Sequence, residues 1–181
     1  MTNMEIVIDA EIVKGYYEEV VLEIAPALTG EPSMIFNRVG PKDRACLDAG
    51  GQIEHEWRGL VSPEWFEPWY ARLLIEGKAI TLPVNTCPTL RRKLEQQGGF
   101  PRGSKDFWYI RTAKAVVDRS GRGIIISEDM DFHDPTKKMS DGVRRDRIMR
   151  AGNGPVAKLL KKEQIIVKCV AGYLEFMEGG H

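Results

Sequence analysis

The sequence of 181 residues lacks any long apolar segment, because no run approaches the ~18 residues that a membrane-spanning helix requires. It also lacks an excess of charge of either sign, since 26 Lys and Arg residues balance 26 Asp and Glu residues. No overall field therefore draws the chain to nucleic acid or to an anionic membrane. The first residues have neither the basic stretch nor the apolar stretch of a signal peptide. We expect a cytoplasmic protein that does not associate with membranes.

Cysteine is scarce, and its spacing argues against a cross-linked domain. Cys46, Cys87 and Cys169 lie far apart and form no CxxC pair, so neither a disulfide framework nor a structural zinc site is expected. We expect core thiols instead. The proportions of hydrophobic residues (43%) and charged residues (29%) are close to globular averages, and the length fits one domain over residues 1–181.

Short apolar runs alternate with segments of helical periodicity along most of the chain. The expected strands lie at 5–9, 44–48, 78–82, 123–127 and 164–170, and the expected helices lie at 10–23, 52–58, 63–76, 88–97 and 107–120. The run 123–127 is continuously apolar, which is typical of a strand buried inside a parallel sheet. The alternation predicts an α/β fold in which helices flank a central, mainly parallel sheet.

Residues 25–44 interrupt this alternation. They contain a high density of residues that break helices and strands, namely Pro26, Gly30, Pro32, Gly40 and Pro41. This density predicts a long irregular insertion with one short strand at 34–36.

Acidic residues follow three of the expected strands or stand near the starts of helices. They are Asp9, Asp48, Glu56, Asp106, and Asp129 with Asp131. Because open parallel sheets bind ligands beyond the carboxyl ends of their strands, these acids are candidates for one site. Carboxylates gathered without cations repel one another, whereas a divalent metal such as Mg²⁺ or Mn²⁺ would compensate their charge. Taken singly, the acids have plainer explanations, with Asp106 as a helix cap and Asp129 or Asp131 as a turn residue.

Four sequence blocks resemble the PIN-domain family of metal-dependent nucleases. They are Ile6-Val-Ile-Asp9-Ala10, Ile53-Glu-His-Glu56-Trp57, Lys105-Asp106-Phe-Trp-Tyr-Ile-Arg-Thr-Ala113, and Ile125-Ile-Ser-Glu-Asp129-Met-Asp131-Phe132. Their order is similar to that family's first Asp after its first strand, a Glu on an early helix, an Asp that opens a late helix, and an S/T-x-D-x-D-F turn. The third and fourth blocks, at their mutual spacing, are the specific part of the resemblance. It implies a three-layer, PIN-like fold.

The resemblance also implies a set of catalytic, metal-binding acids, which are Asp9, Glu56, Asp106 and Asp129. It adds Asp131 as a further metal-binding acid, with Ser127 in support, and Mg²⁺ or Mn²⁺ as the cofactor. Glu54 lies about 200° around the same expected helix from Glu56, so only one of the two should face the metals. Trp57 favours Glu56, because an aromatic residue follows this acid in the family.

The implied ligand set suggests a mechanism that needs no serine or cysteine nucleophile. One or two metals would bind a scissile phosphate, lower the pKa of a bound water and stabilise charge on the leaving oxygen. His55 and His133 flank the acidic blocks, where a histidine can shuttle protons. We nevertheless expect them to be surface residues, as lone histidines near turns usually are.

The segment 135–162 is strongly basic, although the whole chain is neutral. Nine basic residues and two acidic residues give it a charge of +7, so the rest of the chain carries −7. Such a segment beside a metal site would suit nucleic acid, and the predicted binding residues are Lys137, Lys138, Arg144, Arg145, Arg147 and Arg150. The alternative is a solvated loop and helix face. Gly142, Gly152, Gly154 and Pro155 suggest that part of the segment is mobile until a partner orders it.

Aromatic residues are the remaining candidates for contact with unpaired bases. The candidates are Tyr16, Tyr17, Trp57, Trp65, Trp69, Trp108 and Tyr109. Most aromatic residues at helical spacing pack in cores, and we expect Trp65 and Trp69 to form one apolar stripe.

The first functional hypothesis is a metal-dependent endoribonuclease that acts on single-stranded or loop RNA, where the choice of RNA follows from the resemblance alone. A homodimer and an inhibitory protein partner are compatible with it. The alternative is a catalytically silent PIN-like module that binds RNA or protein. A phosphatase with an Asp nucleophile is disfavoured, because the DxD expected after the first strand reads Asp9-Ala10-Glu11.

Overall fold

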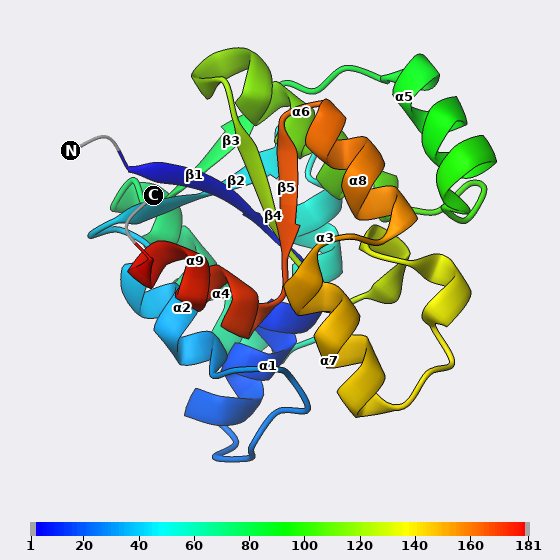
Figure 1. Ribbon diagram of the computed structural model, residues 1–181. Coiled ribbons are helices and arrows are strands. Elements are labelled where there is room, and N and C mark those ends of the chain that lie inside the picture. Colours follow the sequence, from blue (N-terminus) through cyan, green and yellow to red (C-terminus); the bar gives the residue numbers. More distant parts are fainter. Residues whose placement is uncertain (1–2, 180–181) are drawn as a thin grey trace.

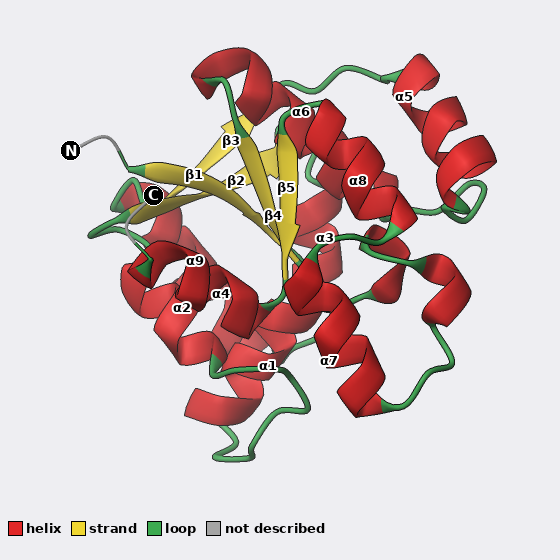
Figure 2. Ribbon diagram, in the orientation of Figure 1, coloured by secondary structure: helices red, strands yellow, loops and turns green. Residues whose placement is uncertain are grey.

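The computed structural model describes residues 3–179, whose five strands form one sheet (Figure 2). The strands are β1 (Met4–Ile8), β2 (Asp43–Asp48), β3 (Ala79–Leu82), β4 (Gly123–Ile126) and β5 (Ile165–Lys168). The α-helices are α1 (Ala10–Val20), α2 (Pro32–Arg38), α3 (Gln52–Gly59), α4 (Pro63–Ile75), α5 (Pro88–Lys93), α6 (Phe107–Ser120), α7 (Gly142–Ala151), α8 (Pro155–Lys162) and α9 (Val170–Glu178). Shorter turns of other helix types are η1 (Leu94–Gly98), η2 (Met130–Phe132) and η3 (Pro135–Lys137). None of the helices in this described part of the chain is both long and apolar enough to cross a membrane.

The sheet is parallel throughout and has the strand order β3-β2-β1-β4-β5. Helices α1, α2, α4 and α9 lie on one side of the sheet, and α6 and α8 lie on the other (Figure 1). The chain builds outward from β1 to β3, then returns to place β4 on the free side of β1. The predicted α/β fold with a central parallel sheet between helical layers is confirmed.

Strands β1 and β4 form the centre of the core. Their register pairs Ile6 with Ile124 and Ile8 with Ile126, and all four side chains are fully buried. Helices cover both faces of these strands, so both faces carry apolar side chains without the alternation of a half-exposed strand. This is the reason for the continuous apolar run at 123–127.

Two of the three cysteines are core thiols, as predicted. Cys46 and Cys169 are buried and free, whereas Cys87 is partly exposed. Burial, followed by repulsion from Glu5, raises the pKa of the Cys46 thiol to about 12. This thiol therefore stays protonated and behaves as a small apolar side chain.

The strand predicted at 34–36 is wrong, because these residues belong to helix α2. Pro32 occupies the first turn of that helix, where its missing N–H costs no hydrogen bond. The backbone N–H and the hydroxyl of Ser33 both donate to the Glu19 carboxylate on α1, each at 2.8 Å. Phe36 of α2 packs on Tyr16 of α1. Contacts with α1 thus stabilise a helix that the density of prolines and glycines concealed.

The basic segment 135–162 is also more regular than predicted, since η3, α7 and α8 account for most of it. Gly152 ends α7 with a φ of 62°, in the left-handed region that favours glycine. Gly154 and Pro155 then begin α8. The residues that suggested mobility therefore mark helix ends, and ordering of the segment by a partner stays a prediction.

The aromatic stripe on α4 is confirmed. Trp65 and Trp69 stack with their ring centroids 4.8 Å apart. Tyr16 lies 6.1 Å from both rings, and Tyr17 lies 5.1 Å from Trp65. These aromatic residues join α1 to α4, so their role in the structure is packing between helices.

Gly123 lets α6 approach β4 closely. A Cβ atom at this position would lie 2.5 Å from the backbone carbonyl oxygen of Ala113 on α6, so a backbone would have to move. Because Asp106 directly precedes α6 and Asp129 follows β4, this approach also sets the separation of those two acids.

We expect Gly123→Ala to lower the free energy of unfolding by roughly 1 to 3 kcal/mol, the usual cost of overpacking. Gly59→Ala is the matched control, because a Cβ there has no neighbour within 4 Å. The control should change stability by less than about 1 kcal/mol, with a tendency to stabilise. Chemical denaturation measures both values, and equal stabilities would contradict the close approach of α6 to β4.

Candidate metal centre

The candidate site lies where the chain reverses the direction in which it adds strands to the sheet. β1 has β2 on one side and β4 on the other. Asp9 follows β1, and its backbone N–H donates to the carbonyl oxygen of Ile126, the last residue of β4, at 3.0 Å. The residues after these two strands therefore meet at one edge. Open α/β sheets bind ligands at such a switch point, beyond the carboxyl ends of the strands.

Three carboxylates meet at this edge. One oxygen from each of Asp106, Asp129 and Asp131 lies within 4.8 Å of the other two, and we call these three residues the acid cluster. The turn after β4 is held by its own hydrogen bonds, because the N–H of Asp129 donates to Ser127 Oγ at 3.0 Å and the N–H of Asp131 donates to Asp129 Oδ1 at 2.9 Å. The fold thus brings together acids from two sequence blocks that lie more than twenty residues apart.

Asp106 does not cap helix α6, which removes the plainer explanation of this residue. It stands at the N-terminal boundary of the helix, but its side chain accepts no hydrogen bond from the helix backbone. Instead Oδ2 accepts from the Ser104 hydroxyl at 3.1 Å. Burial and repulsion from Asp129, with smaller repulsion from Glu56 and Asp131, raise the pKa of Asp106 to about 6, against the lowering effect of Ser104. The carboxylate therefore faces other acids.

Asp9 adjoins the acid cluster without belonging to its closest group. Its side chain is only 6% exposed, and its Oδ2 accepts from the Ser127 hydroxyl at 2.5 Å. Burial is the main cause that raises the pKa of Asp9 to about 7, and repulsion from Asp106 and Asp129 adds to it, while the Ser127 hydrogen bond opposes it. The same Ser127 oxygen accepts from the backbone of Asp129, so one hydroxyl links the ends of β1 and β4.

The structure places Glu56, rather than Glu54, beside the acid cluster, and its role as a metal ligand stays a prediction. The hydroxyl of Tyr109 donates to Glu56 Oε2 at 2.7 Å and accepts from the N–H of Ala10 at 3.2 Å. Glu54 points elsewhere and pairs with Arg58. Like Asp9, Glu56 lies outside the closest group of three, although it contributes to the raised pKa of Asp106. The sequence pattern marked Tyr109 only as a candidate for base stacking, whereas its hydroxyl fixes Glu56 from a position three residues after Asp106 on α6.

Asp48 has a purely structural role at the end of β2. Its two carboxylate oxygens accept from the backbone N–H groups of Gln52 and Ile53 at 3.0 and 2.8 Å. These bonds satisfy donors at the start of α3, where a carboxylate also interacts favourably with the helix dipole. Asp48 thus stabilises the start of α3 and does not belong to the acid cluster.

The predicted nucleic-acid residues divide into two groups. Lys138 Nζ donates to Asp131 Oδ2 at 2.8 Å, and this bond is the main cause of the raised pKa of Lys138. Arg145 and Arg150 line a groove beside the acid cluster. The other predicted residues, Lys137, Arg144 and Arg147, line neither the groove nor the cluster.

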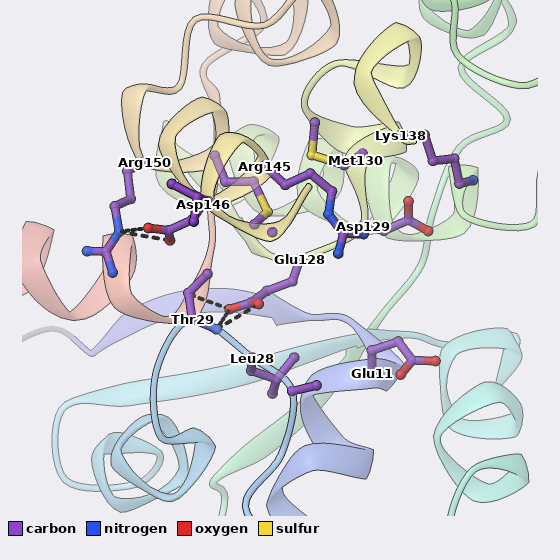
Figure 3. A pocket seen from close by; sticks show the side chains of 14 residues that line it. Glu11, Leu28, Thr29, Glu128, Asp129, Met130, Lys138, Arg145, Asp146 and Arg150 are labelled. Carbon is purple, nitrogen blue, oxygen red and sulfur yellow. Dashed lines mark hydrogen bonds and ion pairs between the residues drawn. The ribbon is translucent and has the colours of Figure 1, made fainter. Parts of the chain in front are cut away.

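This groove was not predicted. It has a volume of about 820 Å³ and is lined by the loop 27–29, the turn 128–130 and helix α7, and we call it the α7 groove (Figure 3). Asp129 and Lys138 also line it, so it is continuous with the acid cluster. The insertion and the basic segment were each visible as patterns, but neither pattern indicates that the two segments face each other.

The expectation that His133 is a surface residue is wrong. Its side chain is fully buried, and Nε2 lies 3.0 Å from the carbonyl oxygen of Ser127. Burial lowers the pKa of His133, so the imidazole is neutral. The backbone carbonyl of His133 accepts from the N–H of Val156 at 3.2 Å, so the residue ties the turn after β4 to α8. His55 is exposed, as expected.

No family model matches the sequence, and no curated protein or solved structure matches it either. The four sequence blocks are therefore the ground for the PIN resemblance, which stays a prediction. The convergence of the acids is an independent observation, because it rests on the fold and on side-chain positions.

The raised pKa of Asp9 predicts how metal-free stability depends on pH. The folded protein keeps the Asp9 carboxyl protonated up to about pH 7, whereas the ordinary pKa of this group is 3.8. Between these two pH values the native state therefore binds more protons than the unfolded state. The contribution of Asp9 to the free energy of unfolding is therefore at its maximum below pH 3.8, and it is lost as the pH rises towards 7. The maximum slope for one proton is about 1.4 kcal/mol per pH unit.

We expect Asp9→Asn to remove this contribution, so the metal-free variant should lose less stability than the parent between pH 4 and pH 7. Urea denaturation at several pH values in EDTA measures the difference, and subtraction cancels the groups that both proteins share. Parallel stability curves for the two proteins would show that Asp9 is not held protonated by its surroundings.

Proposed function

We propose that the protein is a metal-dependent nuclease of the PIN type that uses Mg²⁺ or Mn²⁺ to hydrolyse phosphodiester bonds of single-stranded or loop RNA. The observation that carries this proposal is the convergence of Asp106, Asp129 and Asp131 within 4.8 Å at the β1–β4 switch point. The basic segment beside these acids supports a phosphate-containing substrate. The choice of RNA, and a cytoplasmic location, rest on the sequence predictions.

The donor set fits a hard divalent cation. Every side-chain donor of the acid cluster is a carboxylate oxygen, which is the ligand type that Mg²⁺ and Mn²⁺ prefer. Asp9 and Asp106 have raised pKa values partly because of the other acids around them, and a cation would remove that repulsion. The acid cluster would hold the metal, with Asp9 and Glu56 next to it.

The surrounding residues of the chain position these acids. Tyr109 holds Glu56 through its hydroxyl, and Ser127 holds both the Asp9 carboxylate and the backbone of Asp129. Lys138 has a half-exposed side chain that now pairs with Asp131. Its ammonium group is therefore placed to exchange that carboxylate for a substrate phosphate.

The chemistry requires no covalent intermediate with the protein. The hydroxyl of Ser127 is buried and already donates to Asp9, so it is not available as a nucleophile. A divalent cation at the acid cluster would supply a water of lowered pKa and compensate charge on the leaving oxygen. The protein's own contribution is to orient the substrate and to keep the acids at fixed distances.

We expect Asp106→Asn to reduce cleavage by roughly 100-fold or more, because loss of a direct ligand should exceed the 10- to 100-fold effects typical of second-shell changes. Asp118→Asn is the matched control, since Asp118 is an exposed acid near the other end of α6. The measurement uses labelled RNA and DNA oligomers with Mg²⁺, Mn²⁺ or EDTA, and isothermal titration with Mn²⁺ follows metal binding separately.

Three outcomes of this experiment have distinct meanings. Metal-dependent cleavage that Asp106→Asn abolishes and Asp118→Asn preserves supports the nuclease. Binding of Mn²⁺ and of oligomers without cleavage favours the catalytically silent binding module. Cleavage at full rate by Asp106→Asn would remove this residue from the mechanism.

A further inference from the structure

The α7 groove has the size and position of a substrate subsite. Its volume of about 820 Å³ is within the range of roughly 300 to 1,000 Å³ that is typical of small-molecule pockets. It shares Asp129 with the acid cluster, so the groove lies directly beside any nucleic-acid strand that is bound at the cluster.

The groove has an apolar side formed by flexible, polarisable residues. Met130 and Met149 are almost fully buried and form a small hydrophobic cluster with Cys169, separate from the main core. Leu28 and Val143 add apolar surface, and Val143 is 73% exposed although it lines a hollow. None of the lining residues is aromatic. The accessible part of this surface is aliphatic and the polarisable thioethers lie beneath it, so it can pack against a base without a stacking aromatic side chain.

The charged groups of the groove include an unpaired cation. Arg150 is bound to Asp146 and Glu175, whereas the Arg145 guanidinium has no ion-pair partner among residues 3–179. Figure 3 shows the Arg145 side chain reaching from α7 toward Asp129. An exposed guanidinium that is free to form two parallel hydrogen bonds is well suited to a phosphate.

One wall of the groove, the loop 27–29, is tied to the turn that carries Asp129. The carboxylate of Glu128, the residue before Asp129, accepts from the N–H and hydroxyl of Thr29 and from the N–H of Val170. The Thr29 hydroxyl in turn accepts from the N–H of Ala171 at 3.2 Å. The loop 27–29 is therefore held at a fixed position relative to Asp129.

We propose that the α7 groove holds one nucleotide of single-stranded nucleic acid, adjacent to the scissile phosphate. Its base lies between Leu28 and Val143, above the buried Met130 and Met149 side chains, and Arg145 binds its phosphate. A base in this position has left the helical stack, so the groove selects unpaired strands over duplex. The position of the scissile phosphate rests on the proposed nuclease function, whereas occupation of the groove does not.

The test follows the methionine methyl groups by NMR in full-length protein with [¹³C-methyl]methionine. The Asp106→Asn background preserves the oligomer, and the probe is a single-stranded RNA hexamer of mixed sequence. We expect ring-current shifts at the methyl groups of Met130 and Met149, with Met34 on α2 unchanged as an internal reference. A duplex of the same sequence should bind at least tenfold more weakly.

A pair of charge variants tests the groove without relying on activity. Val143→Glu places a negative charge inside the groove and should weaken hexamer binding by roughly tenfold or more, because like charges repel at short range. Met139→Glu is the matched control, because Met139 is 96% exposed, lies four residues away and does not line the groove. It should weaken binding less than threefold.

The results separate this inference from the nuclease proposal. Hexamer binding without shifts at Met130 and Met149, equal effects of the two Glu variants, or no binding at millimolar hexamer would each overturn the groove assignment. Cleavage by the unmutated protein combined with unshifted methyl groups would overturn it as well, while the nuclease proposal survives. Shifted methyl groups without any metal-dependent cleavage would support the groove and contradict the nuclease.

Discussion

The parallel pairing of β1 with β4 is the constraint on which the candidate site depends. It places the first residue after each strand at one sheet edge, so Asp9 and the turn that contains Asp129 become neighbours although they are 120 residues apart. Close packing of α6 on these strands then brings Asp106 to the same place, and Tyr109 on the same helix reaches Glu56. A shift of β4 by one residue would reverse which face its side chains occupy and would disperse the acids.

Electrostatic repulsion within this arrangement is costly, and the surrounding structure offsets only part of it. The Ser127 hydroxyl, the Ser104 hydroxyl and Lys138 each donate to one of the acids. Burial and mutual repulsion nevertheless dominate, so the pKa values of Asp9 and Asp106 remain well above their ordinary range. Perturbed pKa values of this kind cluster at functional sites. The proposed divalent cation would offset this repulsion.

The order of strands and helices was largely predictable, because each buried strand and each amphipathic helix has a local pattern. Helix α2 was missed because Pro32 and the nearby glycines resemble a loop, while its stability comes from Ser33 and Phe36 contacts with α1. The acids of the site were recognisable from their sequence blocks. Which of them lie closest together was not, because Asp131 joins Asp106 and Asp129 only through the geometry of the turn after β4. The burial of His133 and the α7 groove depend on how distant segments pack, which no local pattern contains.

Anomalous diffraction from crystals grown with Mn²⁺ would reveal whether the carboxylates at the β1–β4 edge hold a divalent metal. We expect an anomalous peak at ligand distance, roughly 2.0 to 2.6 Å, from carboxylate oxygens of Asp106, Asp129 and Asp131, with Asp9 and Glu56 adjacent. The peak should disappear in Asp106→Asn crystals of the same form. A map with no peak at this edge, or with Mn²⁺ bound only elsewhere on the protein, would contradict the proposed metal site.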